Sequence, residues 1–370
     1  MRNLLFSILL LLPLAGFAQY TISGRILNKA DKSPVASASV FLNNTLVGVR
    51  AADNGSFSLS NVKSGQYDLV ISSVGYETGH TTIMVSADLS LPDIYLAPKA
   101  IALREVKVIP DAEKTRLYQM FKRLFLGSSP YSEQCKIVNP DVIDIDYDKP
   151  AHILSATSSD FIEIENTALG YRIKYLLTSF SNDEKERMLY FEGSALFEEL
   201  PGTKHQQRVW KNNRLNAYKG SSMHFLRSLI SNDIYPEGFK VLKLVRKINP
   251  DYNSSGKKYT ETLYTAPLIP ADMVKRTDAT GLFALSFNDC LYVMYSAQLN
   301  ATPVAQMIKD GQTVPDYLNG YITTTLIFEK HYAVFDANGV FIDPSSVIFE
   351  GKWGETRMAE LLPVDYNPGK

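Results

Sequence analysis

Histidine is the side chain that most often supplies acid–base catalysis at neutral pH or binds a metal. The chain has five: His80, His152, His205, His224 and His331. None is followed by glutamate three residues later or by a second histidine at metal-site spacing, so the patterns of zinc hydrolases are absent. Ser221 lies close to His224, but at the expected start of a helix, where serine is a favoured N-cap. We therefore interpret Ser221 as a helix cap, and the sequence predicts no catalytic residue.

An alternating run of aspartates is the strongest metal-ligand pattern in the chain. Asp144, Asp146 and Asp148 would share one face of a strand and present carboxylates to a cation. A calcium loop would need glycine where Lys149 stands and a bidentate glutamate where Ser155 stands. The run is therefore interpreted as a solvated strand face, and neither a metal nor another cofactor is predicted.

Charge is distributed unevenly, although the whole chain has 38 basic and 39 acidic residues and a net charge of -1. Residues 141–199 hold thirteen acids and five bases, a net charge of -8, whereas residues 200–260 hold twelve bases and three acids, a net charge of +9. Within the basic block, Lys204, Arg208 and Lys211 are spaced to share one face of a helix predicted over 205–215.

Two interpretations of this cationic face stay open. It could bind an anionic polymer or a lipid headgroup, with salt-sensitive affinity. Alternatively, the acidic and basic blocks face each other within one domain or are simply solvated, since surface charges need no function. The near-neutral net charge excludes a long-range electrostatic attraction of the whole protein to nucleic acid or to an anionic membrane.

The first eighteen residues have the features of a secretory signal peptide. Arg2 supplies the positive start, an apolar run interrupted by Pro13 covers 4–17, and Gly16 and Ala18 supply small residues at the cleavage site of signal peptidase. The run is shorter than the roughly 20 residues that span a bilayer, and no later segment is longer. We therefore expect an exported protein that starts at Gln19 and has no transmembrane segment after signal removal.

The chain has only two cysteines, Cys135 and Cys290. Disulfides persist in exported proteins, so a bridge between them is one hypothesis. Two separately buried thiols are the other, because the sequence does not give the distance between the residues.

Residues 20–98 have the pattern of an antiparallel β-sandwich. Short alternating segments are separated by turn residues, and Asn54–Gly55 suits a tight hairpin. Tyr67, Leu69 and Ile71 are spaced to lie on one buried face of a strand. A small sandwich with one core stripe is expected.

Four blocks in this region resemble the carboxypeptidase regulatory-like domain. They are Ile22–Ile26, Pro34–Val40, Asp53–Leu59 and Gly65–Leu69, the last running on to Gly75–Tyr76. Ala52 departs from the family, which usually has threonine there. The resemblance implies a seven-stranded, transthyretin-like sandwich with a structural and adhesive role and no catalytic residues.

The same module often precedes TonB-dependent outer-membrane transporters, and Leu103–Val108 resembles the link that follows it there. A transporter barrel of about 22 strands at about 10 residues each would consume most of the remaining chain. The chain also ends without the terminal aromatic strand of such barrels. A transporter is therefore disfavoured.

The sequence of 131–370 predicts an α+β domain with mostly antiparallel strands. Apolar residues at helical spacing predict an amphipathic helix over 111–126, and further helices are expected over 205–215 and 221–230. Segments such as 169–175 and 361–366 are similar to uncharacterised exported bacterial envelope proteins that carry the same module. The expected class is mainly β, organised as signal peptide 1–18, sandwich 19–98, linker and helix 99–130, and α+β domain 131–370.

These observations favour a non-catalytic exported protein of the cell envelope, located in the periplasm, at the outer membrane or outside a diderm bacterium. Its expected partner is an envelope protein or an anionic glycan, and not nucleic acid. The alternative is a carboxypeptidase-like hydrolase or peptidase whose site is assembled from residues scattered along the sequence.

Overall fold

The computed structural model describes residues 19–99, 110–252, 258–279, 281–296 and 321–369. The expected signal peptide and the segment 103–108 lie outside the described residues. The chain divides into two compact units, one formed by 1–42 with 47–100 and the other by 43–46 with 101–370.

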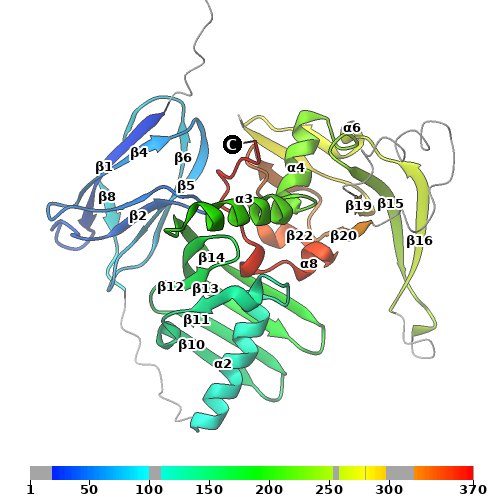
Figure 1. The fold of residues 1–370 in the computed structure, drawn as a ribbon, viewed down its shortest axis with the longest axis horizontal. Helices are drawn as coiled ribbons and strands as arrows, with labels where there is room; N and C mark the ends of the chain where they lie inside the picture. The colour runs from blue at the N-terminus through cyan, green and yellow to red at the C-terminus, as the bar shows by residue number, and fades with distance from the viewer. Residues whose placement is uncertain (1–18, 100–109, 253–257, 280, 297–320, 370) are drawn as a thin grey trace, which may run out of the picture. The chain divides into compact units, whose positions relative to one another are not determined.

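The first unit is a β-sandwich of short strands (Figure 1). Its strands are β1 (Tyr20–Asn28), β2 (Ser39–Leu42), β3 (Gly48–Arg50), β4 (Ser56–Val62), β5 (Gly65–Ser72), β6 (Gly79–Val85), β7 (Leu89–Ser90) and β8 (Ile94–Leu96). One sheet has the order β4-β1-β7 with β8 also on β1, and the other has the order β3-β2-β5-β6. Leu69 and Ile71 are fully buried in the shared core and Tyr67 packs against it, which confirms the predicted core stripe.

The sandwich has eight strand segments in place of the seven that the resemblance implied. The extra segment arises because β7 and β8 both pair in parallel with β1, at successive positions along it. Pro92 lies between them and has no N–H to donate, so it interrupts what would otherwise be one edge strand. The mainly β class is unaffected.

The second unit begins with a helix packed on an antiparallel sheet (Figure 1). The helix α2 (Asp111–Leu126) is followed by η1 (Ser132–Gln134), β9 (Cys135–Ile137), η2 (Pro140–Val142), β10 (Ile143–Asp148), β11 (Ile153–Ser158), β12 (Ile162–Asn166), β13 (Tyr171–Asp183) and β14 (Met188–Glu199). Phe121 and Phe125 are fully buried and stack on each other, and Phe121 meets Phe180 of β13 with ring centroids 4.9 Å apart. The predicted helix is confirmed, and its four buried residues belong to the core of this unit.

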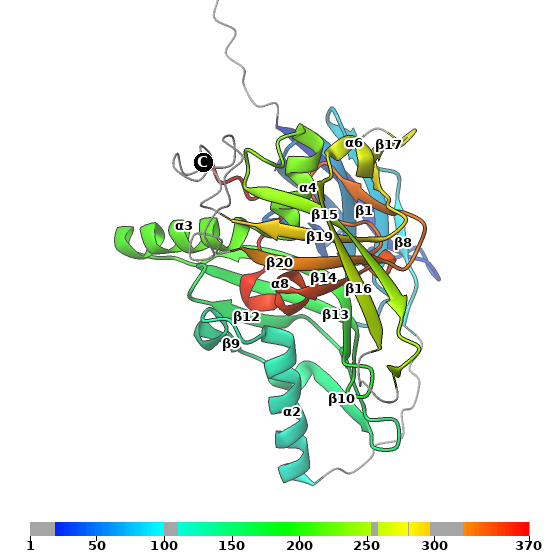
Figure 2. The same cartoon turned by 90° about the vertical axis from the view of Figure 1, so that its right-hand side faces the viewer.

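A second sheet in this unit has the order β16-β15-β19-β20-β22, and Figure 2 shows β15, β19 and β20 side by side. The elements are α3 (Lys204–Tyr218), α4 (Ser222–Ser231), β15 (Phe239–Ile248), β16 (Tyr259–Pro267), α6 (Pro270–Met273), β17 (Val274–Arg276), β18 (Leu282–Leu285), β19 (Cys290–Tyr295), β20 (Ile322–Phe328), β21 (Ala333–Asp336), η4 (Pro344–Ser346), β22 (Val347–Gly351), α8 (Lys352–Glu355) and η5 (Met358–Glu360). Phe225 and Leu229 of α4 share a core with Phe239 of β15 and Trp353 of α8. Among the described residues, no helix is long and apolar enough to cross a bilayer.

The structure leaves both cysteines as free, buried thiols, so it has no bridge between them. Cys135 lies on β9 in the core under α2, whereas Cys290 lies on β19 and pairs with Leu244 of β15. Burial raises the pKa of the Cys135 thiol to about 12 and also raises the pKa of Cys290. Both thiols are therefore protonated and poorly nucleophilic at neutral pH.

We expect a thiol-labelling reagent to react slowly with the native, unreduced protein at neutral pH. Unfolding in denaturant without a reductant should then expose two reactive thiols per chain. A sample reduced before unfolding provides the control for complete labelling. If the unreduced, unfolded chain labelled at neither cysteine while the reduced chain labelled at both, the thiols would be bridged and this part of the structure would be wrong.

A candidate anion-binding face on α3

The inner face of α3 is fixed to the turn that joins β12 to β13. The Trp210 indole N–H donates to the Thr167 carbonyl at 2.8 Å, and the Asn213 amide donates to the Ala168 carbonyl at 2.8 Å. The Arg214 guanidinium continues the series, with Nε 2.7 Å from the Leu169 carbonyl and Nη2 3.2 Å from that of Gly170. Three side chains within about one helical turn thus donate to the carbonyls of residues 167–170 and hold the helix in place.

Two glycines allow the Trp210 ring to lie directly on the backbone. A Cβ atom at Gly170 or at Gly202 would overlap the indole ring, and Gly170 also has a φ of +71°. Only 6% of Trp210 is exposed. The ring therefore anchors the middle of α3 to the sheet, while the first two turns extend beyond it.

The predicted cations lie on these first turns. Lys204, Arg208 and Lys211 are all exposed on α3, so the structure confirms that the sequence spacing brings them to one helix face. The helix begins with a capping box in which Thr203 accepts from the Gln206 N–H and the Gln206 side chain accepts from that of Thr203. None of the three cations forms an ion pair with any residue that the structure describes.

Among the described residues, ion pairs join the two charge blocks of the sequence at two points. Arg214 pairs with Glu199 at 2.7 Å, and Lys258 lies 3.5 Å from Glu186. Many of the described acids pair locally instead, as Glu165 does with Arg172 on the neighbouring strand. The acidic strands therefore do not neutralise the outer face of α3.

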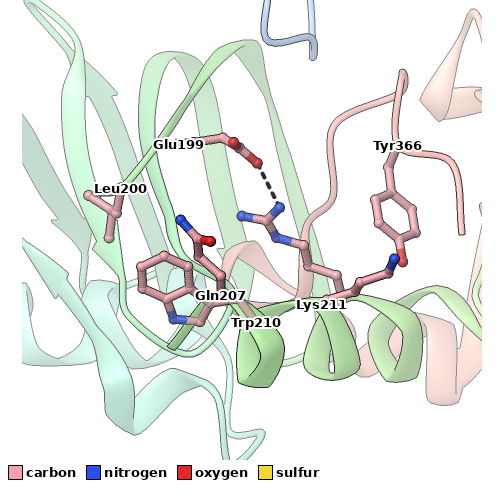
Figure 3. Close-up of a pocket in the computed structure, with 7 residues that line it drawn as sticks. Glu199, Leu200, Gln207, Trp210, Lys211 and Tyr366 are labelled. Atoms are coloured by element: carbon pink, nitrogen blue, oxygen red, sulfur yellow. Dashed lines mark hydrogen bonds and ion pairs between the residues drawn. The ribbon is translucent and has the colours of Figure 1, made fainter. Parts of the chain in front are cut away.

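A pocket of about 320 Å³ opens beside this face (Figure 3). Gln207, Trp210, Lys211 and Arg214 form its floor, at positions that follow one stripe along α3. Its walls come from Glu199 at the end of β14, from Leu200 directly after this strand, and from Tyr366 in the C-terminal segment. The sequence did not predict this pocket. The helical spacing of the floor residues was readable, but nothing in the sequence indicates that the walls meet them.

Ser221 and His224 have structural partners. The Ser221 hydroxyl caps α4 by accepting from the His224 backbone N–H at 3.1 Å, which confirms the predicted cap. The His224 ring is buried; its Nδ1 accepts from the Gly220 N–H at 3.1 Å and its Nε2 lies 2.9 Å from Glu237. Burial lowers the pKa of His224 below its ordinary value, although Glu237 opposes this effect. The arrangement orders the start of α4, with the hydroxyl facing the backbone and not the ring.

The other sequence candidates lie on the surface of β10. Asp144, Asp146 and Asp148 are exposed on one face of this strand, and the residues between them point toward the core. In the described part of the chain, no three histidine, cysteine or carboxylate side chains are grouped as a metal site requires.

Comparison with known proteins identifies the first unit. The model of the CarboxypepD_reg-like domain matches residues 22–108, a range that contains all four sequence blocks. No curated protein matches the chain.

Several solved structures are similar to parts of the chain. One is a type II cohesin–X-dockerin complex from Acetivibrio cellulolyticus, with 24% identity and a TM-score of 0.20 over 21% of this chain and 58% of that chain. Another is a DUF3823 family protein from Bacteroides ovatus, with 15% identity and a TM-score of 0.19 over 50% of this chain and 83% of that chain. A third is a candidate carbohydrate-binding protein from Bacteroides uniformis, with 8% identity and a TM-score of 0.18 over 86% of this chain and 98% of that chain.

TM-scores this low support no conclusion about the function of this chain, so the family match is the finding that identifies part of it. It confirms the resemblance seen in the four sequence blocks. Residues 22–108 therefore belong to the CarboxypepD_reg-like domain family.

Proposed function

We propose that this chain is a non-catalytic, exported protein of the bacterial cell envelope that binds an anionic glycan through the outer face of α3. The observation that carries the proposal is the set of three exposed cations on α3 that have no ion-pair partner among the described residues. They are presented by a helix whose inner face is fixed by three side-chain hydrogen-bonding residues. Because the helix is already held in place, binding a polyanion to these unpaired cations does not require the helix to be ordered first, which lowers the entropic cost of binding.

The rest of the chain is compatible with this role. The sequence features of 1–18 support export to the periplasm, the outer membrane or the medium of a diderm bacterium. The CarboxypepD_reg-like domain supplies a second surface, which we assign to contact with an envelope protein. The net charge of -1 limits non-specific attraction, so binding of a polyanion has to come from a local face.

Removing the cations of this face should weaken binding of an acidic polysaccharide such as polygalacturonate. Exposed ion pairs contribute about 0.2–1 kcal/mol each, so the triple variant Lys204→Gln/Arg208→Gln/Lys211→Gln should bind about tenfold more weakly at low salt. The affinity of the unmodified protein should fall as ionic strength rises, because the Debye length shortens from about 30 Å at 0.01 M to about 10 Å at 0.1 M. Titration calorimetry at several salt concentrations measures both effects.

A matched control removes the same number of charges from another helix of the same unit. The variant Lys114→Gln/Lys122→Gln/Arg123→Gln changes α2 and should retain the binding of the unmodified protein. Equal losses in both triple variants would show that net charge alone is responsible. No binding by the unmodified protein at low salt would refute the proposal.

A further inference from the structure

The pocket beside α3 is continuous with the cationic face. A second, more open hollow is lined by Lys204, Gln207, Arg208 and Lys211, and it shares Gln207 and Lys211 with the pocket. Lys204 and Lys211 are seven residues apart, which corresponds to about 10 Å along a helix. A chain-like ligand that follows the outer face of α3 would therefore reach the mouth of the pocket at Lys211.

The pocket walls are held in position before any ligand binds. The Leu200 N–H donates to the Gly170 carbonyl at 3.0 Å, so the segment after β14 is fixed to the same turn that anchors α3. On the other side, Arg227 of α4 donates to the carbonyls of Tyr366 and Val364 at 2.9 and 2.8 Å. All seven lining residues belong to the second unit.

The charges of the lining favour a ligand with a single negative charge. Arg214 is already engaged with Glu199 and with the carbonyls of residues 169 and 170, whereas Lys211 forms no ion pair within the described part of the chain. The two cations and the one carboxylate leave a net charge of +1. A dianion such as a phosphate monoester would find one uncommitted cation and would be repelled by Glu199.

The remaining lining groups match the hydroxyls of a sugar ring. The Glu199 carboxylate and the Gln207 amide oxygen accept hydrogen bonds, and the Tyr366 hydroxyl can donate and accept. Burial raises the pKa of Tyr366, so this hydroxyl stays protonated at neutral pH. The volume of about 320 Å³ lies at the small end of ligand pockets.

We propose that this pocket binds one carboxylate-bearing sugar unit, with its carboxylate at Lys211 and its hydroxyls at Glu199 and Tyr366. The inference rests on the proposed function and deepens it, because it names the acidic unit that the glycan must carry. The unit at the end of such a glycan, or a free sugar acid, occupies the pocket, and neighbouring units lie along Arg208 and Lys204.

Free galacturonate and galactose test the pocket separately from the face, because a monomer is too small to use both. We expect galacturonate to shift the NMR signals of Tyr366 and the Trp210 indole, and we expect galactose to leave them unchanged. Lys211→Met should weaken galacturonate binding about tenfold or more, since it removes a hydrogen bond to a charged group. Leu200→Trp should abolish the binding by filling the pocket. Val209→Trp, which adds the same ring to α3 outside the pocket, should not change it.

The outcomes separate this inference from the proposed function. If polygalacturonate bound through the cationic face but galacturonate did not bind, or if Leu200→Trp and Val209→Trp bound it equally, the pocket assignment would be wrong and the proposed function would stand. If galacturonate bound in the pocket and polygalacturonate did not bind the face, the pocket assignment would stand and the proposed function would fail. Tighter binding of inorganic phosphate than of galacturonate would overturn the choice of a carboxylate.

Discussion

Gly170→Ala is expected to lower the free energy of unfolding of the second unit by about 2–5 kcal/mol. Two physical causes combine at this position. The φ of +71° costs an alanine about 1–2 kcal/mol, and the new Cβ would overlap the Trp210 ring, which adds about 1–3 kcal/mol of overpacking. The overlap can be relieved only if α3 or the turn between β12 and β13 moves. The cationic face and the pocket should therefore be disturbed together with stability.

Gly281→Ala is the matched control, because Gly281 has a φ of +80° and, its chain neighbours aside, no described atom lies within 4 Å of the position of a Cβ. It should cost only the backbone penalty of about 1–2 kcal/mol. Urea unfolding followed by tryptophan fluorescence is a suitable measurement, since the two tryptophans of the chain, Trp210 and Trp353, both lie in the second unit. Equal losses in the two variants would mean that the Trp210 ring does not pack against Gly170.

Arg214→Met is expected to lower the free energy of unfolding of the same unit by about 2–4 kcal/mol. The guanidinium donates to two backbone carbonyls and to Glu199, and it lies 3.8 Å from the centroid of the Tyr171 ring. Methionine keeps much of the apolar stem but removes all of these hydrogen bonds, and the Gly170 carbonyl then retains only the Leu200 N–H as a donor. Arg214→Lys should restore little of the loss, because a single ammonium group cannot reproduce the fork of donors.

The same substitution elsewhere on the helix isolates this effect. Arg208→Met changes an exposed arginine of α3 that has no ion-pair partner among the described residues, so its effect should stay within about 0.5 kcal/mol. Urea unfolding of the two variants under identical conditions gives the comparison. A loss in Arg208→Met as large as in Arg214→Met would contradict the division of α3 into an inner, anchoring face and an outer, free face.

Local sequence signals predicted the elements that depend on local interactions. The spacing of Leu117, Phe121 and Phe125 places them on one face of α2, and the helix has the predicted bounds, Asp111–Leu126. Ser221 caps α4 as expected. The spacing of the sandwich strands was equally readable, since one face of each strand is buried against the other sheet.

The sequence patterns gave a wrong prediction, or none, where tertiary contacts determine the secondary structure. The sequence pattern of 321–335 predicts a single strand, but the structure has two, β20 and β21, which belong to different sheets and are separated by residues 329–332. β16 was not predicted, because all nine of its residues are exposed and no alternation of buried and exposed positions marks it. The first case follows from pairing with strands that are distant in the sequence, whereas β16 is an exposed edge strand that pairs with the preceding strand, β15.

The candidate site divides in the same way. Lys204, Arg208 and Lys211 share a helix face because their spacing is local, so the sequence was sufficient to find them. The anchoring role of Trp210 and the pocket wall at Tyr366 depend on contacts with residues 167–170 and with Arg227, which no spacing reveals. The sequence therefore predicted the charge of the site but not its shape.

Hydrogen–deuterium exchange of the mature protein, with and without polygalacturonate at low ionic strength, tests the central claim most directly. If α3 and its pocket bind the anionic glycan, added polysaccharide should slow exchange in peptides that cover 199–214, and the effect should disappear at high salt. Unchanged exchange in these peptides, with protection appearing instead in the sandwich strands of 20–96, would contradict the account.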